Sequence, residues 1–233
     1  MNIPTLSKRL QALAEEVPAG SVPADIGTDH ALLPLYLVGT GRCLRAIAGD
    51  VHKGPFETAC EAVAEAGLSE SISVRHGDGL AVLQPEEADV LILAGMGAVT
   101  MIQIFEAQPE VVAGAKRLIL QPMIGSGALR RWLGVHNFAV VKEDLLEEEG
   151  RFYEFLVAEP GNATKLEEDI LFDIGPLLWQ KRHPLLARLL DERLEHARSV
   201  AMEMRKSKDA VNTQRYKDLC ERIAAMAAKR KCL

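Results

Sequence analysis

The fold follows from one stretch near the N-terminus, Val22-Pro23-Ala24-Asp25-Ile26-Gly27-Thr28-Asp29-His30. It predicts a buried strand that ends at a glycine turn, after which a helix begins. Such a turn lets the backbone approach a ligand closely, and the helix N-terminus adds free N–H donors for polar groups. A second apolar run over residues 44–48 ends in Gly49-Asp50, where an acidic side chain can bind both hydroxyls of a ribose. The two strand ends together indicate a site for a nucleotide-type cofactor.

Two further strands predict polar or glycine-rich loops at the same edge of the sheet. Strand 72–75 leads into His76-Gly77-Asp78-Gly79-Leu80, and strand 90–93 leads into Ala94-Gly95-Met96-Gly97. Helical patterns precede the first strand and follow the strands, over residues 6–17, 31–38, 55–66 and 99–107. Strands that alternate with helices predict a parallel sheet with right-handed crossovers, and ligands bind outside the carboxyl ends of its strands.

The pattern changes after a fifth strand, predicted over residues 117–122, and a helix over residues 128–134. Two extended runs, 138–149 and 151–158, are separated by a tight acidic turn at Glu149-Gly150. Because no crossover fits between them, they must form an antiparallel hairpin. A parallel α/β sheet that ends in such a hairpin is typical of the class I Rossmann-like methyltransferase fold, and most nicotinamide-binding domains lack it.

The remaining chain predicts a separate helical domain. Pro160-Gly161-Asn162 indicates a boundary between domains 1–160 and 161–233. Beyond an interruption at residues 173–176, apolar residues follow steps of three and four, at Leu186, Leu190, Ala197, Val200 and Met204 and again at Tyr216, Leu219, Ile223 and Met226. Ser207-Lys208-Asp209 breaks this register, so we expect two antiparallel helices that form a short coiled-coil hairpin whose apolar seam is its own core.

Charge is distributed unevenly along the 233 residues, whose formal net charge is −6. Residues 1–180 contain 13 basic and 26 acidic side chains, whereas residues 181–233 contain 14 basic and 7 acidic ones. A basic module beside an acidic domain suggests a polyanionic partner, because phosphate contacts supply most of the sequence-independent affinity for nucleic acid. The alternative is a solvated, salt-bridged helix surface.

Other features of the sequence limit the class of protein. A secretory signal pattern and an apolar run of the length that spans a bilayer are both missing, so we expect a cytoplasmic protein that does not bind membranes. The four cysteines are far apart and form no CxxC motif, which predicts reduced thiols and neither a metal site nor disulfides.

Six motifs in this order resemble the bacterial TrmK family, and the resemblance covers essentially the whole chain. They are the run Ala24-Asp25-Ile26-Gly27-Thr28-Asp29-His30-Ala31, Asp50 with Gly54-Pro55, Gly77-Asp78-Gly79-Leu80, Gly95-Met96-Gly97, Leu118-Ile119-Leu120-Gln121-Pro122 and Tyr153-Glu154. The resemblance implies an S-adenosylmethionine-dependent methyltransferase that acts on N1 of adenine 22 in tRNA. It also implies that the C-terminal coiled-coil domain takes part in tRNA binding.

Two positions depart from the family pattern. Ala98 follows Gly97 where the family has a glycine pair, and Met123 stands where Asn is usual after Gln121-Pro122. Ala98 keeps the backbone path if its φ is negative. Met123 removes a side-chain amide from a loop near the target pocket, which puts a base-reading role of this position in doubt.

Asp29 is the expected catalytic residue. Adenine N1 carries an in-plane lone pair and needs no general base, but positive charge reaches the ring during methyl transfer. A carboxylate beside the base would stabilise that charge and accept a hydrogen bond from the exocyclic amine. The alternative is that Asp29 caps the following helix.

The cofactor is expected to contact the ends of the first four strands. Asp50 should bind the ribose or else cap a helix, Asp78 should accept from the adenine amino group or else serve a plain turn, and Asp25 should lie near the methionine ammonium or else be structural. The full predicted set is Asp25, Gly27, Thr28, His30, Asp50, Val51, Gly77, Asp78, Gly79, Gly95 and Met96. His30 could instead begin the helix, and Met96 could fill the core.

Substrate contacts are predicted in both domains. The glycines around Met96 allow a target base to approach the cofactor, and basic side chains of the helical domain could track tRNA phosphates. The predicted set is Gly97, Gln121, Pro122, Arg193, Arg198, Arg205 and Lys206, and we expect a monomer. Each cation alone could instead be a solvated helix residue.

Three other functions remain open at this point. A methyltransferase could act on another RNA site. A nicotinamide-dependent oxidoreductase could use a glycine turn and an acidic second strand, although G-x-G-x-x-G is absent after the first strand. A non-catalytic RNA-binding or coiled-coil adaptor would bind RNA without methyl transfer and without need of Asp50.

Overall fold

The computed structural model describes residues 3–162 and 165–233. The chain divides into two compact units, Met1–Thr164 and Lys165–Leu233. The division falls four residues beyond the boundary that Pro160-Gly161-Asn162 indicated.

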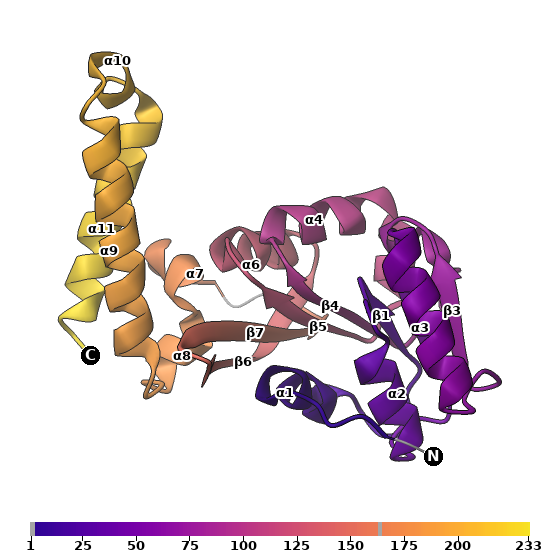
Figure 1. Cartoon of the computed structure of the whole chain (residues 1–233). Coiled ribbons are helices and arrows are strands. Elements are labelled where there is room, and N and C mark those ends of the chain that lie inside the picture. Colours follow the sequence, from indigo (N-terminus) through magenta and orange to yellow (C-terminus); the bar gives the residue numbers. More distant parts are fainter. Residues whose placement is uncertain (1–2, 163–164) are drawn as a thin grey trace. The chain divides into compact units, whose positions relative to one another are not determined.

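The first unit is built on a single seven-stranded sheet with the order β3-β2-β1-β4-β5-β7-β6 (Figure 1). Strands β1 to β5 are parallel, whereas β7 is antiparallel to both β5 and β6. The strands are β1 Pro23–Ile26, β2 Ala46–Asp50, β3 Ile72–His76, β4 Val90–Met96, β5 Arg117–Pro122, β6 Phe138–Glu148 and β7 Arg151–Pro160. The predicted parallel sheet with an antiparallel terminal hairpin is confirmed.

Helices cover both faces of this sheet. They are α1 Lys8–Glu16, α2 Leu32–Gly39, α3 Lys53–Glu65, α4 Ala98–Ala107, α5 Pro109–Gly114 and α6 Ser126–Val135, with a 3-10 turn η1 at Gly79–Val82. Along β4 the side chains of Leu91 and Leu93 pack with α4 and α6, while those of Val90 and Ile92 pack with α1 and α2. Successive side chains of a strand point to opposite faces of the sheet. Because helices cover both faces here, the central strand is apolar at every one of these positions.

Three details differ from the sequence-based expectation. The second strand begins at Ala46, and Leu44 before it is 84% exposed. The fourth strand continues through Gly95 to Met96, with a register shift against β5 between Ala94 and Met96. The short helix α5 was missed because Pro109 interrupts the apolar pattern and restarts a helix at its first position.

A buried ion cluster joins α6 to the terminal hairpin. The guanidinium of Arg130 donates to Glu143 of β6 at 2.5 Å and to Glu154 of β7, and also to the hydroxyl of Ser126 at 3.2 Å. Arg130, Glu143 and Glu154 are each at most 5% exposed. Buried charges of this kind are tolerated only when they are paired, so the cluster fixes how the hairpin docks on α6.

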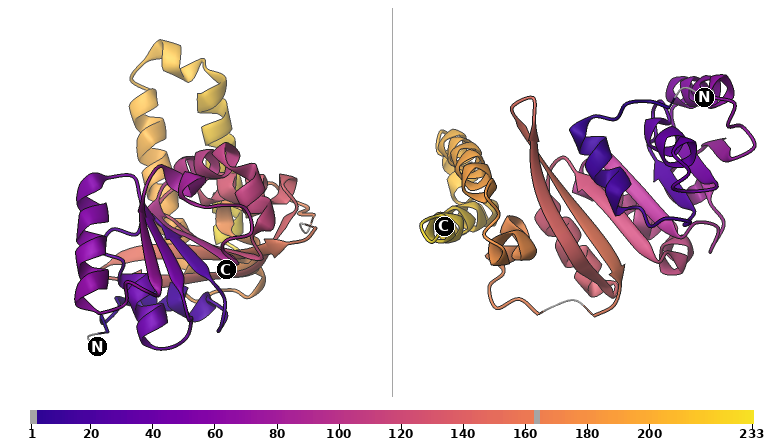
Figure 2. Two further views of the ribbon diagram at one scale, coloured as in Figure 1. Left: turned by 90° about the vertical axis from the view of Figure 1, so that its right-hand side faces the viewer. Right: turned by 90° about the horizontal axis from the view of Figure 1, so that it is seen from below.

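The second unit is entirely helical in the residues described. Its helices are α7 Ile170–Ile174, α8 Pro176–Gln180, α9 Leu186–Met204, α10 Lys208–Val211 and α11 Gln214–Arg230. Helices α9 and α11 lie side by side (Figures 1 and 2), and α10 occupies the break expected at Ser207-Lys208-Asp209. Leu186, Leu190 and Met226 are buried, and the guanidinium of Arg230 binds the carboxylate of Asp191 across the pair at 2.8 and 2.9 Å.

The described residues contain neither a membrane-spanning helix nor a metal-binding cluster. Within them, every helix is too short or too polar to cross a bilayer. The same residues contain no group of three or more His, Cys, Asp or Glu side chains arranged to hold a metal ion.

Replacing the arginine of the buried cluster should destabilise the first unit strongly. Arg130→Met leaves two carboxylates buried without their cation, and breaking such a pair costs about 3–5 kcal/mol. We expect a lower urea midpoint by circular dichroism. Lys53→Met is the control, because Lys53 is 79% exposed in its ion pair with Glu57 and the variant should leave the midpoint nearly unchanged. Equal midpoints for the two variants would contradict a stabilising role of the cluster.

Candidate active site

The predicted site lies at the edge of the sheet where the parallel strands end. Strands β1 and β4 are neighbours in the sheet. The sheet continues from β1 through β2 to β3 on one side and from β4 to β5 and the terminal hairpin on the other, so the strand order reverses between β1 and β4. This is the position at which open α/β sheets bind their ligands. The loops after β1, β2, β3, β4 and β5 therefore bring the predicted residues of the first unit to one edge.

The turn after β1 has an unusual backbone. Gly27, Asp29 and Ala31 have φ values of 78°, 54° and 52°, all in the left-handed region. Gly27 adopts this conformation without cost, whereas Asp29 and Ala31 are strained by it. Strained residues of this kind cluster at functional sites, where surrounding bonds hold them.

Hydrogen bonds tie this turn to the end of β2. The amides of Gly27 and Thr28 donate to the carbonyl of Gly49 at 2.8 and 3.1 Å, and the amide of Asp29 donates to Asp50 Oδ2 at 3.3 Å. These three amides are therefore bound by β2 and are not donors for a ligand. The turn depends on β2 for its shape.

Asp29 itself is open to solvent. Its side chain is 66% exposed, and its carboxylate lies 3.6 Å from Nε2 of His30, which is 56% exposed. The N-cap position of α2 belongs to Ala31, so the alternative in which Asp29 caps this helix is wrong. Both Asp29 and His30 can therefore meet a ligand at the strand edge.

Asp25 is the buried carboxylate of the site. It accepts a 2.7 Å hydrogen bond from the Thr28 hydroxyl. Burial raises the pKa of Asp25 from 3.8 to about 6, against the opposing effects of the Thr28 bond and the charge of Arg9, and with a further increase from Asp50. Thr28 is also buried, and its hydrogen bond fixes the orientation of the Asp25 carboxyl group. A cation placed beside Asp25 would restore the charged form of this carboxyl.

Asp50 binds backbone amides on both sides. Oδ2 accepts from Asp29 as above, and Oδ1 accepts from the amide of His52 at 2.8 Å. The N-cap residue of α3 is His52, so the alternative that Asp50 caps this helix is wrong. Its carboxylate is fixed between two loops of the strand edge, which suits an acceptor for ligand hydroxyls.

The loop after β3 places Asp78 in solvent between two glycines. The amide of Gly77 donates to the Asp50 carbonyl at 3.0 Å, and a Cβ at Gly77 would lie 2.7 Å from Val82. Gly79 has a φ of 51°. Nearby, the carbonyl of Val51 lies 3.0 Å from Nε2 of His76. The second and third loops thus form one wall of the edge.

The loop after β4 forms the opposite wall. A Cβ on Gly27 would lie 3.1 Å from Cε of Met96, so these two predicted cofactor-binding residues face each other. The carbonyl of Met96 accepts from the amide of Met123, and the amide of Ala98 donates to the carbonyl of Ile124. Gly97 and Pro122 lie within this pair of joined loops.

Gln121 is buried and oriented by an arginine that sequence reasoning missed. Its Oε1 accepts from Arg9 at 2.9 Å and from the Gly95 amide at 3.2 Å, so Nε2 lies toward Met123, 3.6 Å from the sulfur. The guanidinium of Arg9 also lies 5.6 Å from the ring centroid of Tyr153. The sequence signal for Arg9 was a basic residue within the first amphipathic helix.

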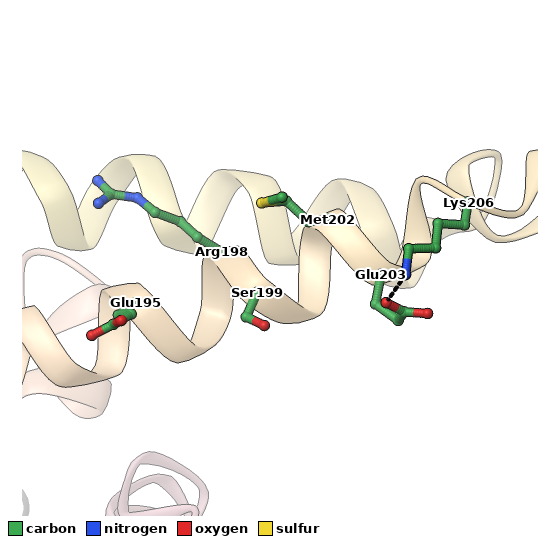
Figure 3. A pocket seen from close by; sticks show the side chains of 6 residues that line it. All are labelled: Glu195, Arg198, Ser199, Met202, Glu203 and Lys206. Atoms are coloured by element: carbon green, nitrogen blue, oxygen red, sulfur yellow. Dashed lines mark ion pairs between the residues drawn. The ribbon is translucent and has the colours of Figure 1, made fainter.

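In the helical unit, the four predicted RNA-binding cations differ in their contacts. Arg193 donates to the carbonyl of Asp173 at 2.6 Å, and Arg205 donates to the hydroxyl of Tyr216 at 2.7 Å. Arg198 is exposed, and Lys206 pairs with Glu203 at 2.6 Å on the surface. A shallow groove of about 570 Å³ along α9 is lined by Glu195, Arg198, Ser199, Met202, Glu203 and Lys206 (Figure 3).

The strand order, the antiparallel hairpin and the acidic strand edge define a class I Rossmann-like methyltransferase. A family model described as TrmK, tRNA (adenine(22)-N(1))-methyltransferase, matches residues 23–228. The chain belongs to the TrmK family.

Individual relatives agree over nearly the full length. The tRNA (adenine(22)-N(1))-methyltransferase of Bacillus subtilis is 40% identical over 228 residues, which cover 96% of each chain. The crystal structure of B. subtilis TrmK has a TM-score of 0.86 at 37% identity and covers 97% of each chain. Streptococcus pneumoniae Sp1610 in complex with S-adenosyl-L-methionine has a TM-score of 0.85 at 35% identity and covers 97% of this chain and 100% of its own.

The pH dependence of stability should reveal the buried carboxyl. Because the pKa of Asp25 is raised to about 6 in the folded state, cofactor-free protein loses stability as the pH rises from about 4 to about 6. Asp25→Asn lacks this loss. We expect its melting temperature to exceed that of the wild type at pH 7.5, by an amount equivalent to about 1–3 kcal/mol, and this excess to shrink at pH 4.5.

Asp89→Asn is the matched control with the opposite sign. The Lys116 ammonium and the Val22 amide hold the pKa of Asp89 below its usual range, so this carboxylate stabilises the fold above its unfolded pKa. Asp89→Asn should lower the melting temperature at pH 7.5, and by less at acid pH. A pH-independent difference between Asp25→Asn and the wild type would contradict the raised pKa of Asp25.

Proposed function

We propose that this protein transfers the methyl group of S-adenosylmethionine to N1 of adenine 22 in tRNA. The observation that carries the proposal is the set of four aspartates at one strand edge of a TrmK-family sheet. Asp25 is buried there, Asp50 is fixed between two loops, and Asp29 and Asp78 are exposed. Four carboxyl groups at one edge suit a cationic donor and a product base that becomes cationic.

The residues present fit S-adenosylmethionine. Asp50 offers an acceptor for ribose hydroxyls, Asp78 offers one for the adenine amino group, and Asp25 offers a carboxylate for the ammonium of the methionine part. Gly27 and Gly95 have φ values of 78° and 76°, and their lack of a Cβ leaves room beside Met96 and Arg9. When bound, S-adenosylmethionine supplies an electrophilic methyl group on a sulfonium centre.

Asp29 is the residue that we assign to the transition state. Adenine N1 is nucleophilic in its neutral form, so the protein has to hold N1 in line with the methyl group and stabilise the charge that reaches the ring. The exposed carboxylate of Asp29 can accept a hydrogen bond from the exocyclic amine and stabilise that positive charge with its own negative charge. Asp50 Oδ2 holds the backbone of Asp29 in the strained turn, so the cofactor and substrate sites share one support.

Exposed cations of the helical unit are proposed to bind the tRNA backbone. Arg198 of α9 and Lys206 just after this helix are exposed and can reach phosphates, whereas Arg193 is held by the Asp173 carbonyl and supports the helical unit. We further propose that the enzyme acts as a monomer in the cytoplasm. The buried Leu190 and Met226 support the monomer, because the α9–α11 pair covers them within one chain.

Replacing Asp29 or Asp50 by asparagine should separate the effect on methyl transfer from the effect on cofactor binding. Asp29→Asn keeps the size but loses the charge, so we expect kcat to fall by roughly 100-fold with little change in cofactor affinity. Asp50→Asn retains one acceptor oxygen, so cofactor affinity should fall by about tenfold. The measurements are calorimetry with S-adenosylmethionine and mass spectrometry of nucleosides from unmodified bacterial tRNA.

Asp89→Asn at the opposite edge of the sheet is the control and should retain both properties. Methylation by the wild type at a position other than adenine 22 would remove the substrate assignment. Wild-type kcat in Asp29→Asn would remove its assigned role. An adaptor without catalysis would bind tRNA equally well in all variants and transfer no methyl group.

Salt dependence should identify the cations that contact phosphate. Arg198→Ala combined with Lys206→Ala should weaken tRNA binding and lower the slope of log Kd against log salt by roughly two. Arg45→Ala with Lys116→Ala removes the same charge from the edge where the strands begin and should leave the slope unchanged. Equal slopes for the two double variants would contradict a role of α9. Filter binding across a salt series is the measurement.

A further inference from the structure

Four large apolar side chains are exposed beside the active-site edge: Val51 after β2, at 48%, and three that follow β4 and β5. Val99, Met123 and Ile124 are 64%, 48% and 75% exposed, and they lie in the segments that follow β4 and β5. Leu44 and Val135 are also exposed, but Leu44 precedes β2 and Val135 ends α6, so both lie where the parallel strands begin. An exposed apolar group costs free energy in water, which makes a cluster at a binding edge a candidate contact surface.

The loop that carries Met123 and Ile124 is held firmly. Its two ends are tied to the loop after β4, because the Met123 amide donates to the Met96 carbonyl at 2.9 Å and the Ala98 amide donates to the Ile124 carbonyl at 3.0 Å. Gln121 Nε2 contacts the Met123 sulfur at 3.6 Å. The side chain of Ile124 therefore projects from a fixed backbone directly beside Gly97.

We infer that Ile124, supported by Met123, is the wedge that enters the tRNA base stack beside adenine 22 and fills the place that this base leaves. The inference rests on the proposed function. A base inside a folded RNA has to leave its stack before an enzyme can reach a ring nitrogen. Isoleucine and methionine are typical wedge residues, because they contact base faces and make no hydrogen bond that selects a sequence.

The surrounding charge favours bases over phosphates as the occupant of this surface. Asp25, Asp29, Asp50 and Asp78 line the edge and repel the RNA backbone, whereas the neutral faces of bases carry no such penalty. Ile124 is the most exposed of the four apolar side chains at this edge. Met123, which stands where the family usually has Asn, extends the same apolar surface. In this position it contacts RNA and does not read a base.

A tRNA with 2-aminopurine at position 22 tests the inference, because its fluorescence rises when the base leaves the stack. The protein is added without methyl donor, and kcat is measured separately on unmodified tRNA. We expect a fluorescence rise with the wild type and with Ile124→Leu. Ile124→Ala should lose the rise and lower kcat by roughly tenfold. Leu44→Ala removes an even more exposed apolar side chain, 84% against 75%, from the opposite edge and should behave as the wild type.

The outcomes separate the wedge from the reaction. Wild-type fluorescence and kcat in Ile124→Ala would overturn the inference while methylation of adenine 22 stands. So would methylation by a wild type that produces no fluorescence rise. A loss of S-adenosylmethionine affinity in Ile124→Ala, measured by calorimetry, would instead make the residue structural and overturn the inference. Failure of the wild type to methylate adenine 22 would remove the proposed function and the wedge together.

Discussion

The hydrogen bonds between the turn after β1 and the end of β2 are the constraint on which the site depends. Asp29 and Ala31 adopt left-handed backbone conformations that cost about 1–2 kcal/mol each. The Gly49 carbonyl and the Asp50 carboxylate hold this turn through the amides of Gly27, Thr28 and Asp29. Asp50 is thus both a predicted cofactor ligand and the support of the predicted catalytic residue, which couples the two sites through one side chain.

The sheet could be predicted because its signals are local. Buried strands are apolar runs, and each of the first five ends at a polar or glycine loop, while the acidic turn at Glu149-Gly150 leaves no room for a crossover. The order of the strands places their ends at one edge by a general rule. Asp25, Asp50 and Asp78 could therefore be assigned to the same site before any contact between them was known.

Contacts between distant residues could not be predicted in this way. Nothing local in α1 indicates that Arg9 reaches Gln121 and the ring of Tyr153, because the pairing depends on how α1 packs across β5 and β7. The cluster of Arg130, Glu143 and Glu154 is hidden for the same reason, since each residue alone resembles a surface charge. Burial, which decides the pKa of Asp25, likewise becomes visible only when the sheet is assembled.

The opposite charges of the two parts of the chain follow from the chemistry of a cationic donor and a polyanionic substrate. In the proposed function, carboxylates at the strand edge attract a sulfonium and stabilise a methylated base, but they repel the phosphates that the base brings with it. The basic side chains that compensate are concentrated after residue 180, within the helical unit. Contacts with the bases that flank the reacting base are then best made by neutral groups, and the apolar loop at Met123 and Ile124 suits them because it can contact RNA without adding a charge of either sign.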